Sequence, residues 1–146
     1  MKKTMEAQVQ WLQNPINTDL RTGSLLKDLR IDRTNKKIGQ MQSIFLDEAA
    51  RGSMDPDTMV YSVESWRPVE EGTEGGLFWG NSTVFPGMVG DEYFMTRGHF
   101  HSLRNRAEFY ITVSGTGMLV LYAPRLGRVV CTLWTSYLLS LRSFVG

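Results

Sequence analysis

The sequence predicts an all-β domain, a small antiparallel sandwich or barrel, preceded by a helical or irregular arm. The first observation is that segments rich in β-branched and aromatic residues alternate with turns rich in glycine and proline, as in sandwiches and barrels. The second is size: 146 residues, 42% of them hydrophobic and 21% charged, suit one domain with one core. We divide this single domain into an arm (1–58), a set of strands (59–121) and an atypical tail (122–146).

The arm begins with a weakly patterned stretch. Residues 1–35 are polar, and residues 19–37 are compatible with either a short helix or an irregular segment. Apolar side chains then recur at a spacing of three and four residues, at Ile38, Met41, Phe45 and Ala49. This spacing, with Gly52 just past its end, predicts an amphipathic helix stopped by glycine.

Four strands are predicted after a turn at 55–58, where two aspartates flank a proline. Each is a short run of strand-forming residues, and the runs are 59–66, 77–85, 91–96 and 107–113. A loop rich in glycine and glutamate, 67–76, separates the first two, and Pro86 and Gly87 close the second. Short strands punctuated by glycine are typical of a β sandwich or barrel.

Composition excludes several classes of protein. The formal net charge of +1 gives no reason to expect a nucleic-acid partner. No apolar run approaches the roughly 20 residues that cross a bilayer, and residues 1–15 lack the apolar segment of a secretory signal, so we expect no membrane partner. Cys131 is the only cysteine, which rules out an internal disulfide and favours a reducing, cytoplasmic setting. We expect its thiol to be buried.

The two histidines of the chain, His99 and His101, stand one residue apart, and Glu108 follows. On an extended chain residues i and i+2 share a face, so both imidazoles can reach one divalent cation. In the strand predicted next, Glu108, Tyr110 and Thr112 share a polar face opposite an apolar one, and in a barrel that polar face can point inward.

Two histidines and one carboxylate are the ligand set of non-haem Fe(II) sites with open positions, and the same donors accept Mn, Ni or Zn. We therefore predict a divalent metal ion as cofactor, with Fe²⁺ first. The alternative to a metal site is a pair of exposed histidines on an edge strand.

His99, His101 and Glu108 resemble the first conserved motif of the cupins, and residues 82–121 more narrowly resemble the cupin-type glucose-6-phosphate isomerases. Six residues separate His101 from Glu108, the gap of that branch, and the Pro86–Gly87 turn, the stretch 89–96 and Gly98 fall in the branch's order. With looser likeness upstream, the resemblance covers 38–121. It implies a cupin jelly-roll barrel, a homodimer and a sugar-phosphate substrate.

The resemblance also implies roles for individual residues. It makes His99, His101 and Glu108 metal ligands, together with a further histidine from a second motif. It assigns Thr96 and Gly98 to the sugar-phosphate pocket, with Tyr110, Thr83 and Tyr61 as further contacts. A bulge at Gly98 would bring Thr96 to the side of His99. The implied reaction interconverts glucose 6-phosphate and fructose 6-phosphate, with Glu108 as the base if a proton is transferred and a lesser role for it if a hydride shifts.

The tail departs from this pattern. Residues 122–146 contain no Asp, Glu, His, Asn or Gln, so they offer no third histidine and no carboxylate. Either three ligands and water hold the metal, or the chain is cut short or shifted in frame after Leu121; the loss of family likeness and of strand pattern at one point favours the second. We accordingly expect impaired catalysis. Alternatives are another metal cupin such as a dioxygenase, a non-catalytic sugar-phosphate-binding cupin, or a metal-free jelly roll.

Overall fold

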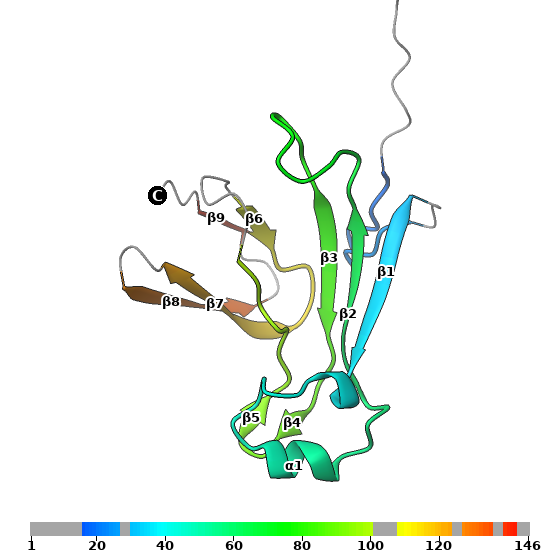
Figure 1. The fold of residues 1–146 in the computed structure, drawn as a ribbon. Helices are drawn as coiled ribbons and strands as arrows, with labels where there is room; N and C mark the ends of the chain where they lie inside the picture. The colour runs from blue at the N-terminus through cyan, green and yellow to red at the C-terminus, as the bar shows by residue number, and fades with distance from the viewer. Residues whose placement is uncertain (1–15, 27–29, 101–107, 124–126, 136–138, 143–146) are drawn as a thin grey trace, which may run out of the picture.

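The computed structural model describes residues 16–26, 30–100, 108–123, 127–135 and 139–142, and these are mostly strands (Figure 1). The strands are β1 (Ile31–Lys37), β2 (Met59–Trp66), β3 (Trp79–Val84), β4 (Met88–Val89), β5 (Glu92–Tyr93), β6 (Glu108–Ile111), β7 (Thr116–Ala123), β8 (Arg128–Thr135) and β9 (Leu139–Arg142). Within the described ranges the only helices are the 3₁₀ helix η1 (Ile38–Gln40) and α1 (Glu48–Ser53). The all-β prediction is therefore confirmed.

The strands form four antiparallel sheets: β1-β2-β3, β4-β5, β6-β9 and β7-β8. In the described part of the chain these sheets do not join into a closed barrel. No helix there has the length and apolar character that crossing a lipid bilayer requires.

In the three-stranded sheet, two strands were predicted and one was not. Strand β2 has the predicted bounds, and β3 is a shortened form of 77–85. Strand β1 was not foreseen, because its sequence IDRTNKK offers a single apolar residue, Ile31. It forms because seven of its residues pair with β2, and because Ile31, only 7% exposed, anchors its start. A polar strand at the edge of a sheet needs no alternation of its own.

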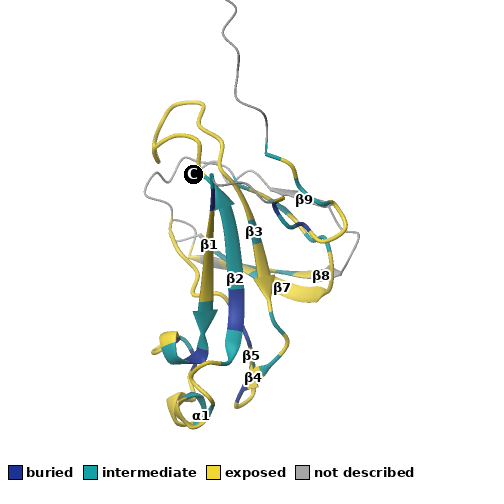
Figure 2. Cartoon of the chain, turned by 90° about the vertical axis from the view of Figure 1, so that its right-hand side faces the viewer, coloured by how far each residue is buried: buried dark blue, intermediate teal, exposed yellow. Residues whose placement is uncertain are grey.

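The core lies at one end of this sheet, where η1, α1, β4 and β5 gather (Figures 1 and 2). Seven side chains, each no more than 8% exposed, make up the core cluster: Ile38, Met41, Phe45, Val60, Tyr61, Val89 and Phe94. Of the apolar spacing read as one helix, Ile38, Met41 and Phe45 lie in this cluster, whereas Ala49 is exposed.

The helix itself was predicted too long. The chain makes one turn of η1, adopts a left-handed conformation at Ser43 (φ 62°), and begins α1 only after Asp47. The Asp47 carboxylate caps α1 by accepting a hydrogen bond from the Ala50 N–H at 2.8 Å. Gly52, expected just past the end, lies inside α1.

The segment before the histidines is less regular than predicted. Of the strand expected at 91–96, only β5 forms; it pairs with β4 across a tight turn in which Gly90 takes a positive φ of 55°. The Leu46 N–H donates to the Glu92 carboxylate at 2.6 Å and ties this hairpin to the loop before α1. From Phe94 to Phe100 the chain is in no regular element.

The tail continues the strand pattern instead of losing it, which corrects the expectation above. Strand β8 pairs along its whole length with β7, and β9 pairs with β6. The Cys131 side chain is exposed, so the prediction of a buried thiol was wrong. One face of the β7-β8 hairpin is apolar and open to solvent; we call it the apolar face, and its residues are Met118, Val120, Tyr122, Val129, Cys131 and Leu133.

A glycine tests the packing of the core. A Cβ added at Gly87 would collide with the ring of Phe94, which is 8% exposed. We expect Gly87→Ala to lower the free energy of unfolding by about 1–3 kcal/mol, because the buried ring must move, as measured by urea denaturation. Gly52→Ala is the matched control: its Cβ would meet nothing within 4 Å, and a helical alanine should stabilise by up to about 1 kcal/mol. Equal stability of Gly87→Ala and the wild type would contradict this packing.

Candidate functional site

Strand β6 carries the carboxylate predicted to matter most. Its side chains alternate as expected: Glu108 and Tyr110 are half-buried, whereas Phe109 and Ile111 are exposed to 44% and 45%. The polar face is thus the inward one. Pairing with β9, in the register Glu108↔Arg142, fixes the strand's orientation.

Glu108 and Tyr110 are joined directly. The Tyr110 hydroxyl donates a hydrogen bond of 2.6 Å to Oε2 of Glu108. Burial of the phenol raises the pKa of Tyr110, and the hydrogen bond to Glu108 raises that pKa further. The phenol therefore keeps its proton at neutral pH and holds the carboxylate in one orientation.

His99 approaches the other oxygen of the same carboxylate. Its Nε2 lies 4.0 Å from Oε1 of Glu108, and its side chain is 68% exposed. One cation with bonds of about 2.1 Å to nitrogen and oxygen can span such a gap. His101 lies outside the described residues, and within them no three His, Cys, Asp or Glu side chains come together. An imidazole and a carboxylate on a partly covered face are donors that suit a divalent metal ion.

Two predicted pocket residues precede these donors, and one further polar residue follows them. Thr96 and Gly98 lie in the irregular stretch before His99, and both are exposed. Gly98 has a φ of 66°, so it does bend the chain there, although no described strand pairs with it. Thr112 continues the polar face beyond β6, and its buried hydroxyl has no hydrogen-bond partner among the described residues.

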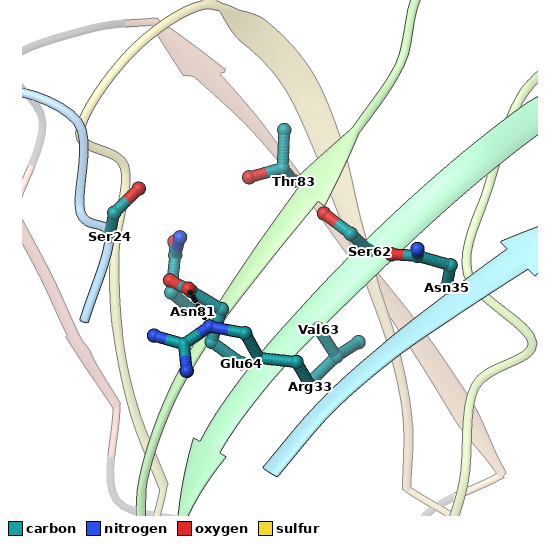
Figure 3. Close-up of a pocket in the computed structure, with 8 residues that line it drawn as sticks. All are labelled: Ser24, Arg33, Asn35, Ser62, Val63, Glu64, Asn81 and Thr83. Atoms are coloured by element: carbon teal, nitrogen blue, oxygen red, sulfur yellow. Dashed lines mark hydrogen bonds and ion pairs between the residues drawn. The ribbon is translucent and has the colours of Figure 1, made fainter. Parts of the chain in front are cut away.

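The other two predicted pocket residues, Thr83 and Tyr61, lie in different surroundings from each other. Thr83 lines a polar hollow of about 220 Å³, whereas Tyr61 is 7% exposed and belongs to the core cluster. The hollow lies over one face of the three-stranded sheet, and its lining residues are Ser24, Arg33, Asn35, Ser62, Val63, Glu64, Asn81 and Thr83 (Figure 3).

Strand register explains why the hollow is polar. Asn35 pairs with Ser62 and Arg33 with Glu64, while Thr83 and Asn81 of β3 stand opposite the same two β2 residues. All six therefore share one face of the sheet. Sequence reasoning missed Arg33, Glu64 and Asn35. The alternation of Ser62 and Glu64 within 59–66 was the available signal.

A model of the family described as glucose-6-phosphate isomerase matches residues 35–133. The match reaches into β8, so the expectation that family likeness stops at Leu121 was wrong.

Individual relatives agree. A glucose-6-phosphate isomerase of Sinorhizobium medicae is 38% identical over 109 residues, which are 73% of this chain and 49% of the relative. One of Thermococcus gammatolerans is 36% identical over 110 residues, 75% of this chain and 56% of the relative. One of Thermococcus litoralis is 37% identical over 91 residues, 61% and 47% respectively.

The chain spans about half the length of these curated relatives. The family model nevertheless covers 35–133, most of the residues that form strands. On this match the chain belongs to the glucose-6-phosphate isomerase family.

Proposed function

We propose that this chain carries a metal-dependent aldose–ketose isomerase site that interconverts glucose 6-phosphate and fructose 6-phosphate. One observation carries the proposal: His99 Nε2 and the Tyr110 hydroxyl approach the two oxygens of one carboxylate, Glu108, at 4.0 and 2.6 Å. Family membership supplies the reaction class, and this cluster supplies a base beside a metal-binding imidazole.

Glu108 is the proposed base. The reaction moves a hydrogen between C2 and C1 of the sugar, and a carboxylate can take a proton from one carbon and return it to the other. Tyr110 holds Oε2, which leaves Oε1 directed toward His99. Tyr110 thereby orients the base, a role additional to the predicted substrate contact.

His99, His101 and Glu108 are the proposed metal ligands, with Fe²⁺ first and Mn²⁺, Ni²⁺ or Zn²⁺ as alternatives. When bound, the ion would act as a Lewis acid toward the sugar oxygens. The chain's own donors for the phosphate and the hydroxyls are the backbone N–H of Gly98 and the hydroxyls of Thr96 and Thr83.

Two broader parts of the proposal have separate support. The resemblance to the cupins supports a jelly roll, in which the observed sheets are parts of one barrel. The exposed thiol of Cys131, the only cysteine, supports a cytoplasmic location, because a free exposed thiol suits a reducing compartment. Fractionation of the native cells, with this chain found outside the cytoplasm, would refute the second.

Substitution of the base tests the function. With added Fe(II), the chain should convert fructose 6-phosphate to glucose 6-phosphate in a coupled assay. Glu108→Gln should lower kcat by about 100-fold or more, because the amide cannot accept the proton. Glu74→Gln, in the exposed loop after β2, is the control and should leave kcat unchanged. Turnover by the wild type no higher than that of Glu108→Gln would refute the assignment.

We also propose a homodimer, formed through the apolar face. Five of its six residues are 54–64% exposed, Cys131 is exposed as well, and none carries a charge. Phe100, 75% exposed, meets Tyr122 edge-on at 6.5 Å and extends the face. A contiguous apolar patch that stays exposed on a folded protein marks an interaction site. Two such faces packed together would bury on the order of 1,000 Å², near the lower limit for a specific interface.

A charge placed on the apolar face tests the dimer. Leu133→Lys should shift the chain from dimer to monomer in sedimentation velocity, with dissociation at least about tenfold stronger, because each copy would bury an ammonium group. Leu46→Lys is the control, since Leu46 is 92% exposed in the loop before α1. A monomeric wild type, or dimers that survive Leu133→Lys, would exclude this interface.

A further inference from the structure

We propose that residues 16–26, here called the strap, close the polar hollow, and that Arg33 and Glu64 hold the strap in place as a clamp. The strap precedes β1 in the sequence and lies beside the β1-β2-β3 sheet in the fold (Figure 1). The strap and its clamp shape the hollow whether or not the chain has isomerase activity.

The strap has a structure of its own. Thr18 and Leu25 form an isolated antiparallel bridge, and the Leu26 N–H donates to the Asn17 carbonyl at 2.8 Å. Within it the Gly23 N–H donates to the Asp19 carbonyl at 2.7 Å, which closes a tight turn. The strap is therefore a small hairpin that can be held or released as a unit.

The clamp acts on the backbone of one strap residue, Leu25. Glu64 Oε2 accepts a hydrogen bond from the Leu25 N–H at 2.8 Å, and Arg33 Nη2 donates to the Leu25 carbonyl at 3.1 Å. The two clamp side chains are themselves paired, with Arg33 Nε 2.9 Å from Glu64 Oε1. Hydrogen bonds that involve charged groups are the stronger kind, and the carboxylate is only 19% exposed.

Two further contacts fix where the strap lies. The Leu25 side chain is 3% exposed, so the clamped residue is also an apolar anchor. Gly23 has a φ of 74°, and a Cβ there would lie 2.9 Å from Asn81 Oδ1 and 3.3 Å from Val113 Cγ2. The strap thus fits closely between β3 and the residues that follow β6.

The position of the strap determines part of the wall of the hollow. Ser24, between the two anchored residues, contributes to its wall, and Arg33 and Glu64 line it as well (Figure 3). A ligand that enters the hollow must meet the side chains that hold the strap. Arg33 and Glu64 are therefore positioning residues, which act through the Leu25 backbone to bring Ser24 to the hollow.

Hydrogen exchange followed by mass spectrometry tests the clamp in the full chain. Glu64→Ala removes the acceptor of the Leu25 N–H and the partner of Arg33. Amide exchange in residues 16–26 should then accelerate about tenfold or more, while exchange in β2 stays slow. Asp32→Asn is the matched control, because Asp32 lies next to Arg33 on β1 but forms its ion pair of 2.7 Å with Arg67, just beyond β2.

A second variant covers the case in which Glu64→Ala does not fold. Arg33→Lys keeps the positive charge but cannot bond the Leu25 carbonyl and Glu64 in the same forked geometry, so strap exchange should rise by a smaller factor. Cleavage by trypsin after Arg21, whose side chain is 90% exposed, should accelerate in the same order of variants. Unchanged strap exchange in either folded clamp variant, or equal acceleration in Asp32→Asn, would overturn the proposal.

Discussion

The pairing of β2 with strands on both of its sides is the constraint on which the rest of the structure depends. Pairing forces consecutive β2 side chains to opposite faces. At one end the β1–β2 register shifts between Lys36 and Lys37, and there the consecutive residues Val60 and Tyr61 both enter the core cluster. Further along, where the register is regular, Ser62 and Glu64 face the polar hollow. One strand thus serves both the packing of the domain and the lining of the hollow, with no break between the two regions.

Strand β6 applies the same rule to the candidate site. Its alternation turns Glu108 and Tyr110 inward and leaves Phe109 and Ile111 exposed. A half-buried carboxylate needs a partner, and the Tyr110 hydroxyl supplies one. The remaining oxygen lies toward His99, so the proposed site needs few elements: one short strand and the bent segment that Gly98 introduces.

The sequence predicted what alternation and turn residues control. The bounds of β2 and the polar face of β6 follow from period-two patterning, whereas His99 approaches Glu108 from a stretch that is in no strand. Strand β1 was missed because an edge strand paired along its length needs little hydrophobicity of its own, and the helix was overextended because Ser43 leaves the helical region. The clamp joins residues 39 positions apart through side chain and backbone, a contact that no local pattern encodes.

We propose that His99 and Glu108 share one metal ion with His101. The most direct test is X-ray absorption at the iron edge of the chain loaded anaerobically with Fe(II). We expect a coordination shell that contains two imidazoles, and the loss of one of them in His99→Ala. A spectrum of the hydrated ion, or a shell unchanged by His99→Ala, would contradict it.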